Sequence, residues 1–460
     1  MEINAGIFKS YDIRGIYPTE IDLPAVKEIA RIFWQKTQAA NQHLAKPHGI
    51  ILARDGRHSS PAIAQTVRET LLALGAEVYD LGAVSINELY FATGIQQAAG
   101  GIMATASHNP PEYGGLKMVL GSRPQTGALE FVPGKDIYQA LQDELVKEAG
   151  AGAPISGQVH ELSVSEEYLN WLLKQVAGQT IKPFKIVLDA GNGMAGAMAK
   201  KILEKLGCQT IDLFLEPHAD FPNRNPNPLV AGAADKCGQA VLENQADFGV
   251  MFDADGDRLF LVDEKGKFVG GDMTLLLIAK AMLVKNLGAG IVYNLICSHA
   301  TPELIVKWGG RAIRSEVGYK NMARHMLTEN GIMSGEVSGH FAFKEHYYAD
   351  SAFLALALVV AALSQDTRPV SEKIAEQSLY YRGAEIALSA ENIVGQMAKL
   401  KEKYAANIHD EMDGLTVEFA DWWFNARPSN TEPILRLTLE AADEASWEAR
   451  KQEVLAVLGN

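Results

Sequence analysis

One arrangement of strand, turn, helix and second strand occurs three times along the chain. Each copy starts with a short apolar strand that ends in a polar turn, continues with a helical stretch and a glycine, and ends in a second apolar strand. The copies cover residues 49–82, 185–214 and 291–318. Apolar strands that alternate with helices of about 10–15 residues are typical of right-handed βαβ units on a parallel sheet. The repetition predicts three related α/β domains in tandem.

The last part of the chain has a different pattern. Residues 415–419 and 434–439 alternate between apolar and polar side chains, as half-buried strands do, and we expect a polar loop between them. A helix from Glu444 to Leu458 is expected to close a smaller α+β domain. We divide the chain into domains at 1–152, 153–266, 267–369 and 370–460, with linkers at 150–154, 265–267 and 365–369.

Charge and hydropathy exclude several classes of protein. The chain has 42 basic and 56 acidic residues and a net charge of −14, which argues against binding to nucleic acid or to an anionic membrane. The longest apolar run, from Ala352 to Leu363, is expected to be a buried helix, because its rise of about 18 Å is well short of the hydrocarbon core of about 30 Å.

The chain shows no sign of secretion. Its first ten residues lack the basic and apolar stretches of a secretory signal. Its three cysteines, Cys208, Cys237 and Cys297, form no disulfide pattern, as is typical of proteins in a reducing compartment. We therefore expect a cytoplasmic protein.

A serine follows the apolar strand at 101–104, in the segment Thr-Ala-Ser-His-Asn-Pro that starts at residue 105. The carboxyl ends of strands in α/β folds are where ligands bind. Ser107 is thus a candidate nucleophile with His108 beside it. The alternative is a structural turn in which serine and asparagine bond to the backbone.

Three aspartates follow a second apolar strand, at 248–252. Asp253, Asp255 and Asp257 alternate with small residues, so that their carboxylates can converge on one cation. Ligation by oxygen alone favours Mg²⁺, with Mn²⁺ or Ca²⁺ as substitutes. An EF-hand is excluded because Arg258 stands where that loop needs glycine, which leaves a solvated acidic turn as the alternative.

Two polar segments could recognise a ligand. In an extended chain Glu336, Ser338 and His340 share one face and match the hydroxyls of a sugar, although an ordinary polar loop is the alternative.

The second segment lies between the C-terminal strands. There Arg427, Ser429 and Thr431 offer the donors of a phosphate-binding loop, for which the alternative is a linker bounded by prolines. Arg14 and Lys117 could add positive charge to such a site.

Together these segments resemble the signature of the α-D-phosphohexomutase family. They occur in the order Thr-Ala-Ser-His-Asn-Pro, Asp-x-Asp-x-Asp-Arg, Gly-Glu-x-Ser-Gly-His and Arg-Pro-Ser-Asn-Thr-Glu-Pro. The resemblance runs from Tyr-Asp-Ile-Arg-Gly at residues 11–15 to the last of these segments, and it is closest to bacterial phosphomannomutases.

The resemblance implies four domains around a central cleft: three α/β domains that carry the phosphoserine, metal and sugar loops, and a smaller domain with the phosphate loop. It implies interconversion of mannose 1-phosphate and mannose 6-phosphate through a phosphoserine at residue 107 and a 1,6-bisphosphate intermediate. Mg²⁺ would be the cofactor, a hexose 1,6-bisphosphate the activator, and the protein a monomer or homodimer.

The resemblance also assigns roles to residues. The metal would be held by Ser107, Asp253, Asp255 and Asp257. Substrate would be bound by Tyr11, Glu336, Ser338 and His340, and its unreactive phosphate by Arg427, Ser429, Asn430 and Thr431. The catalytic set would be Ser107, His108, Lys117, Arg14 and Arg258, with Lys117, His108 and Arg14 as alternative general acids or bases.

The chain departs from the family in the third domain. Ile296 stands where many relatives have a substrate-binding lysine, and Lys320 is our candidate to replace it. The alternatives to a phosphomannomutase are therefore a phosphoglucomutase or dual-specificity mutase, and less strongly a phosphoglucosamine mutase, against which Val337 and Ser429-Asn430-Thr431 argue. A phosphatase and a catalytically silent sugar-phosphate-binding protein also remain as alternatives.

Overall fold

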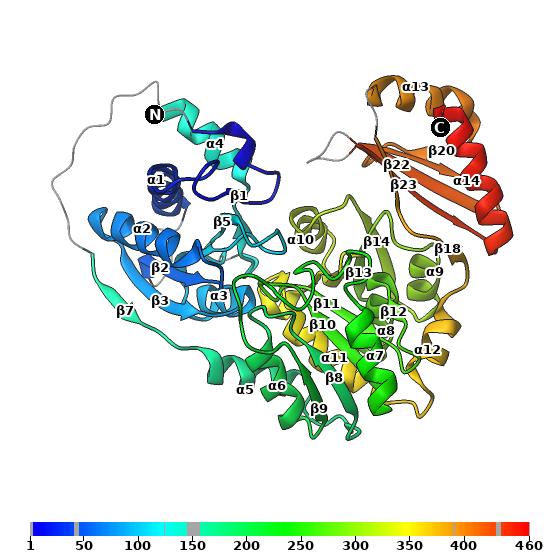
Figure 1. Cartoon of the computed structure of the whole chain (residues 1–460), viewed down its shortest axis with the longest axis horizontal. Coiled ribbons are helices and arrows are strands. Elements are labelled where there is room, and N and C mark those ends of the chain that lie inside the picture. The colour runs from blue at the N-terminus through cyan, green and yellow to red at the C-terminus, as the bar shows by residue number, and fades with distance from the viewer. Residues whose placement is uncertain are drawn as a thin grey trace.

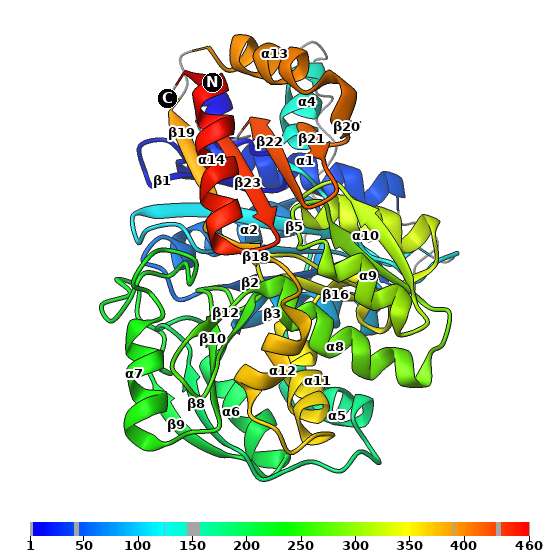
Figure 2. The same ribbon diagram turned by 90° about the vertical axis from the view of Figure 1, so that its right-hand side faces the viewer.

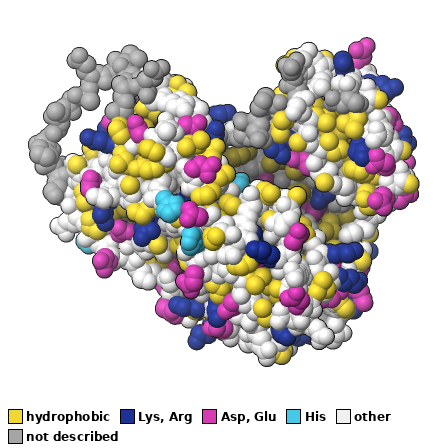
Figure 3. Space-filling model, viewed as in Figure 1, with side chains coloured by type: hydrophobic (Ala, Val, Ile, Leu, Met, Phe, Trp, Pro, Cys, Tyr) yellow, Lys and Arg dark blue, Asp and Glu magenta, His cyan; other side chains and the backbone are white. Residues whose placement is uncertain are grey.

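The computed structural model describes residues 3–40, 46–123, 125–144, 157–389, 392–428 and 434–459. These residues form four sheets that follow one another along the chain. The sheets and their helices form a heart-shaped molecule in which the first and fourth units stand on either side of an opening (Figure 1). The space-filling view is hollowed at the same place (Figure 3). The four-domain α/β architecture expected from the sequence is confirmed.

The first sheet has the order β1-β5-β4-β2-β3-β7, with β6 paired to β5. Its strands are β1 (Ile13–Ile16), β2 (Lys46–Arg54), β3 (Glu77–Ala83), β4 (Ala98–Ala104), β5 (Tyr113–Leu120), β6 (Glu130–Phe131) and β7 (Val159–Glu161). Its helices are α1 (Leu23–Ala40), α2 (Ser60–Ala73), α3 (Ile86–Ile95) and α4 (Gly134–Glu144).

The second sheet has the order β12-β11-β10-β8-β9. Its strands are β8 (Lys185–Asp189), β9 (Gln209–Leu213), β10 (Phe248–Phe252), β11 (Leu259–Val262) and β12 (Phe268–Val269), and its helices are α5 (Ser165–Gln175), α6 (Gly196–Lys205) and α7 (Asp235–Asn244). The turn at 265–267, which we expected to link two domains, instead joins β11 to β12 within this sheet. The sequence signal for a turn there was right, but the turn closes a hairpin.

The third sheet has the order β14-β13-β15-β16-β17. Its strands are β13 (Gly290–Asn294), β14 (Arg311–Ser315), β15 (Gly331–Gly335), β16 (Phe341–Phe343) and β17 (Ala349–Asp350), and its helices are α8 (Gly271–Lys285), α9 (Ala300–Lys307), α10 (Tyr319–Thr328) and α11 (Ala352–Ser364).

Helix α11 is the apolar run singled out in the sequence. It is almost completely buried, with contacts to α5 and α6 of the second unit and to α8 of the third. None of the described helices is long and apolar enough to cross a membrane.

The fourth sheet has the order β18-β23-β22-β21-β20, with β19 paired to β23. Its strands are β18 (Tyr381–Arg382), β19 (Ile386–Ser389), β20 (Ile408–Asp410), β21 (Leu415–Glu418), β22 (Trp422–Pro428) and β23 (Ile434–Ala441). The helices of this part of the chain are α12 (Val370–Gln377), α13 (Ile393–Lys403) and α14 (Glu444–Leu458), of which α13 and α14 cover the outer face of the sheet (Figure 2).

Strand β22 corrects one sequence prediction. We expected a polar loop between residues 419 and 434, but Trp422–Pro428 form a central strand paired to β21 and β23. Trp422, Trp423 and Phe424 are consecutive, so the period-two alternation that marks a half-buried strand is missing. All three side chains are buried in the structure.

The three predicted repeats are related in detail. In each of the first three sheets a central parallel strand lies between two others, in the orders β3-β2-β4, β9-β8-β10 and β14-β13-β15. The third strand of each trio then pairs antiparallel with the next strand along the chain, as β4–β5, β10–β11 and β15–β16. The loop between these last two strands therefore occupies the same position in all three units.

Candidate active site

The three equivalent loops carry the three motifs found in the sequence. Ser107 follows β4, Asp253 to Asp257 follow β10, and Glu336 to His340 follow β15. The isolated bridge between Arg258 and His340 joins the second loop to the third, and Ser107 contacts the second loop from the first. The repeated topology thus brings distant segments of the chain to one place.

Ser107 is buried and points at the aspartates. Its hydroxyl donates to Oδ1 of Asp255 at 3.2 Å and lies 3.2 Å from Nδ1 of His108. Its backbone has a φ of 51°, in the left-handed region that a serine rarely occupies, and its N–H donates to Oγ1 of Thr105. Strained backbone of this kind clusters at functional sites, and here it accompanies a nucleophile candidate aimed at three carboxylates.

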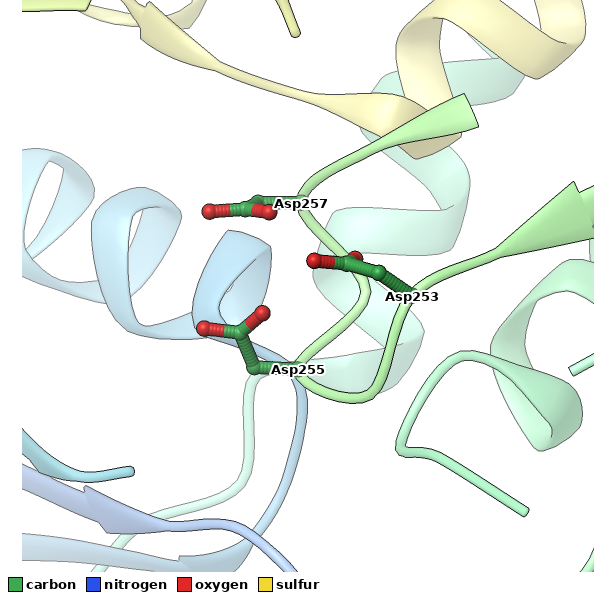
Figure 4. Close-up of side chains that lie close together, drawn as sticks. All are labelled: Asp253, Asp255 and Asp257. Atoms are coloured by element: carbon green, nitrogen blue, oxygen red, sulfur yellow. The ribbon is translucent and has the colours of Figure 1, made fainter. Parts of the chain in front are cut away.

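Asp253, Asp255 and Asp257 converge as the sequence predicted (Figure 4). One oxygen from each lies within 4.8 Å of the others, and all three residues are buried. Oδ1 of Asp257 has no hydrogen-bond partner among the described residues. Three buried carboxylates that share a small volume repel one another unless a cation lies between them. Their oxygen donors fit a hard divalent cation such as Mg²⁺.

Positive side chains surround these carboxylates. The Lys117 ammonium lies 2.7 Å from Asp255 and 2.5 Å from Asp257, and the Arg258 guanidinium donates to Asp253 at 2.8 Å. Burial lowers the pKa of Lys117, but the two carboxylates outweigh it and raise that pKa well above its usual value. Lys117 therefore keeps its proton at neutral pH.

Two histidines beside the aspartates are neutral at pH 7. Burial, together with nearby Arg258 and Arg14, holds the pKa of His108 well below its usual value. Burial likewise lowers the pKa of His340 to about 4, although Asp257 opposes the shift. Neutral imidazoles can accept a proton, whereas Lys117 can donate one.

The first loop also meets Arg14 on β1. This guanidinium donates to Oδ1 of Asn109 at 2.8 Å and is held by Asp12 through its Nε at 2.7 Å. It therefore lies beside the serine loop, as expected for a residue that lines the cleft.

The third loop brings Glu336, Ser338 and His340 together, but by a turn and not by the extended backbone that we expected: the N–H of Gly339 donates to the carbonyl of Glu336 at 3.0 Å, and Gly339 has a φ of 84°. Glu336 accepts hydrogen bonds from the side chain of Asn294 at 3.1 Å and from the backbone N–H of Gly318 at 2.8 Å. Ser338 lies 2.8 Å from Nδ1 of His340. Burial raises the pKa of Glu336. This cluster offers both acceptors and donors to a polyhydroxylated ligand.

Tyr11 reaches the same region from the first unit, where its hydroxyl donates to the carbonyl of Val317 at 2.9 Å. Lys320 is placed differently from the other candidates. Its ammonium lies 3.8 Å from Asp136 of α4, and its side chain is 48% exposed.

Arg427 is the second-last residue of β22. Its Nε is buried without a hydrogen-bond partner among the described residues, and its NH2 donates to Glu385 at 3.3 Å. Ser429, Asn430 and Thr431, the remaining candidates for the phosphate loop, lie outside the described residues.

Some residues at the site were not found from the sequence. Asp350 on β17 is a buried carboxyl whose pKa is raised well above its usual value by burial and then by Asp257 and Glu336. Arg57 is a fully buried arginine behind the serine loop, where its side chain donates to the carbonyl of Ser107. A single aspartate or arginine outside a motif carries no sequence signal of its location, so only the fold reveals them.

Comparison with known proteins identifies the family and its fold. Models of the family described as phosphoglucomutase/phosphomannomutase match most of the chain: alpha/beta/alpha domain I at residues 5–128, domain II at 166–266, domain III at 270–380 and the C-terminal domain at 385–457.

Curated relatives match from end to end. A Xanthomonas campestris protein named phosphohexose mutases is 34% identical over 456 residues, which are 98% of each chain. A Salmonella typhimurium phosphomannomutase is 34% identical over 465 residues, again 98% of each chain. The crystal structure of a phosphoglucomutase/phosphomannomutase family protein from Burkholderia thailandensis is 30% identical, covers 99% of this chain and 97% of its own, and superposes with a TM-score of 0.87. The chain therefore belongs to the phosphoglucomutase/phosphomannomutase family, and this membership supports the activity of a phosphohexose mutase.

Proposed function

We propose that the protein is a phosphomannomutase that works through a phosphoserine at Ser107. The observation that carries the proposal is the contact between Oγ of Ser107 and Asp255, inside a buried group of three carboxylates and one lysine. A hydroxyl so placed is shielded from water and surrounded by groups that suit phosphoryl transfer. Curated relatives named phosphomannomutase support the choice of sugar.

The three aspartates would hold Mg²⁺ together with the phosphate on Ser107. When bound, the ion would offset the negative charge on the transferring phosphoryl group. A fungal N-acetylphosphoglucosamine mutase of the same fold, 16% identical, has been crystallised with GlcNAc-6P and magnesium.

In the first half of the cycle the phosphoryl group leaves Oγ of Ser107 for the free 6-hydroxyl of mannose 1-phosphate. The P–O bond to the serine breaks and the bond to the sugar oxygen forms. The hydroxyl proton of the sugar passes to a base, and Oγ of Ser107 takes up a proton as it leaves. His108 is neutral and lies 3.2 Å from the serine oxygen, so it is our candidate for that base. Lys117 is protonated and would stabilise charge at the reacting oxygens.

In the second half the bisphosphate turns end for end, and its 1-phosphate passes to the serine to give mannose 6-phosphate. The sugar therefore needs one site for a phosphate that does not react, whichever end carries it. Arg427 and Arg258 each keep a buried guanidinium nitrogen without a partner among the described residues, as donors reserved for an anionic ligand would. Ser429, Asn430 and Thr431 would complete that phosphate site, while Glu336 and Ser338 would bind sugar hydroxyls.

Phosphorus NMR tests the proposal. The protein receives Mg²⁺, a trace of hexose 1,6-bisphosphate as activator, and equal amounts of mannose 1-phosphate and glucose 1-phosphate. We expect the mannose ester to be converted to its 6-phosphate faster than the glucose ester. Equal rates would indicate a dual-specificity mutase, because the two sugars differ only at the C2 hydroxyl. Release of inorganic phosphate as the main product would indicate a phosphatase.

The matched control is Ser107→Ala. Intact-mass spectrometry should show an adduct of about 80 Da on the active protein and none on the variant, which should also lose mutase activity. An active Ser107→Ala variant would exclude the phosphoserine mechanism.

A further inference from the structure

Two buried arginines lie behind the catalytic loops, and the mechanism above uses neither. Arg57 lies between β2 and α2 of the first unit, and Arg224 lies in the connection between β9 and α7 of the second. Arg57 makes several hydrogen bonds to backbone carbonyls of the serine loop, and Arg224 makes one to the carbonyl of Phe252, next to the metal loop. One segment of the second unit, residues 216–226, contacts both loops through them, and we call it the bridging loop.

Arg57 holds the serine loop from behind. Its NH2 donates to the carbonyl oxygens of Ser107 at 2.6 Å and Asn109 at 2.5 Å, and its NH1 donates to that of Pro110 at 2.6 Å. Its Nε lies 3.2 Å from the carboxylate of Asp55, which offsets its buried charge. Three carbonyls within four residues can converge on one guanidinium only if the chain turns sharply. The left-handed φ of Ser107 supplies that turn.

The bridging loop packs directly against this turn of the first unit. Phe221 places its ring 5.0 Å from the Arg57 guanidinium, in a cation–π contact. The neighbours of Arg57 also contact the loop: His58 lies 2.8 Å from Asp220, and a Cβ at Gly56 would lie 3.2 Å from Pro217. Three consecutive residues of the first unit, at positions 56–58, therefore lie against three residues of the second unit, all within positions 217–221.

The other end of the bridging loop holds the metal loop. NH2 of Arg224 donates to the carbonyl of Phe252 at 2.6 Å, and Phe252 is the residue immediately before Asp253. Nε of Arg224 donates to Asp189 at 2.9 Å. The guanidinium lies so close over Gly191 that a Cβ there would approach it to 2.4 Å.

We propose that the bridging loop sets the position of Ser107 relative to the aspartates, with Phe221, Arg57 and Arg224 as positioning residues. A phosphoserine and three carboxylates from different domains can share one metal ion only if their separation is fixed. A continuous path runs from Phe252 to Ser107. Arg224 bonds to Phe252 within the second unit, Phe221 of the same loop contacts Arg57 across the domain boundary, and Arg57 bonds to Ser107 within the first unit. None of the three side chains needs to touch the substrate.

This proposal rests on the proposed function, since it assigns Ser107 and the aspartates to one reaction. It predicts a loss of turnover without an equal loss of sugar binding. Misplacing a reacting group by about 1 Å lowers rates by about 10²-fold. We therefore expect Phe221→Ala to lower kcat by about that factor and to change the KM for sugar phosphate by less than about threefold.

The matched control is Phe214→Ala. Phe214 belongs to the same unit and also makes a cation–π contact, with Lys236 at 5.3 Å, but this contact stays within the second unit. We expect this variant to keep kcat within about twofold of the wild type, as surface substitutions usually do. Phe221→Tyr retains the ring and should restore most of the turnover that Phe221→Ala loses.

Hydrogen exchange provides a readout that does not depend on catalysis. Amides of residues 104–109 should exchange faster in Phe221→Ala and in Arg57→Lys than in the wild type or in Phe214→Ala. The proposal would be overturned if Phe221→Ala had the same kcat and the same exchange rates as the wild type. It would also be overturned if Phe221→Ala and Phe214→Ala lost kcat equally. If the wild type carries no phosphate on Ser107 while Phe221→Ala still loosens this loop, the proposed function fails and the positioning role stands.

Discussion

Replacing Lys117 by methionine removes an ammonium that contacts two of the three buried aspartates. Its nitrogen lies 2.7 Å from Asp255 and 2.5 Å from Asp257, and the side chain is almost completely buried. Methionine keeps most of the volume, so the variant tests the charge and leaves the packing largely intact. The expected result is lower stability in the absence of a divalent cation.

The magnitude follows from the geometry. At an effective dielectric constant of about 20, two unit charges about 2.7 Å apart attract each other by about 6 kcal/mol. Desolvation of the ions cancels much of this attraction, and removing one partner of a buried ion pair typically costs about 3–5 kcal/mol. We expect Lys117→Met to lower the free energy of unfolding by about 3 kcal/mol in EDTA. Mg²⁺ at a concentration of about 100 times its Kd should return about 2.7 kcal/mol.

Urea unfolding followed by tryptophan fluorescence, in EDTA and in Mg²⁺, measures both effects. The control is Lys200→Met, which removes an ammonium from a surface ion pair with Asp212 and should leave the unfolding midpoint unchanged. The reasoning is refuted if Lys117→Met is as stable as the wild type in EDTA. It is also refuted if Mg²⁺ does not stabilise the variant.

Three further predictions concern residues around the site. Gly318→Ala should raise the KM for sugar phosphate in steady-state assays. Gly318 has a φ of 112°, and the new Cβ would lie 2.0 Å from the hydroxyl of Tyr11, a proposed substrate-binding residue. An unchanged KM would contradict this prediction. Burial lowers the pKa of His346 to about 4, so the unfolded chain takes up the proton first and stability should fall by about 3 kcal/mol as pH drops from 6.5 to 4. His346→Phe should flatten this dependence in urea titrations at several pH values, and an unaltered pH profile would count against it. Lys320→Met should raise the KM for mannose 1-phosphate if Lys320 replaces the cation missing at Ile296, and equal KM values would assign Lys320 to its ion pair with Asp136.

Much of the fold could be predicted because each repeat carries a periodic signal of its own. The strand ends before Ser107 and Asp253 were located to the residue: β4 ends at Ala104 and β10 at Phe252. The final helix also has the predicted bounds, Glu444–Leu458. These elements combine apolar runs with turn residues or caps, which act locally and can be read from the sequence.

The errors occur where tertiary packing overrides the local pattern. Strand β22 was missed because three consecutive aromatic side chains hide the alternation, and each is buried by a different neighbour. His299 of the third unit, for example, stacks on Trp423 with 4.6 Å between the ring centroids. The guanidinium of Arg450, on α14, lies 5.1 Å from the ring of Trp422. A single-sequence pattern contains neither partner.

The same limit separates the two kinds of residue at the site. The residues that we propose to contact a ligand stand in short motifs, because each loop must present several of them within a few positions, as in the segment from Asp253 to Asp257. Positioning residues need only one long side chain and a target at the right distance. Arg57 precedes the serine loop by 50 positions, and Phe221 precedes the metal loop by about 30 positions, without a pattern around either. The proposed role of Arg57 follows from backbone carbonyls and that of Phe221 from its contact with Arg57, and no sequence motif encodes either. For this reason the structure adds most to the second group.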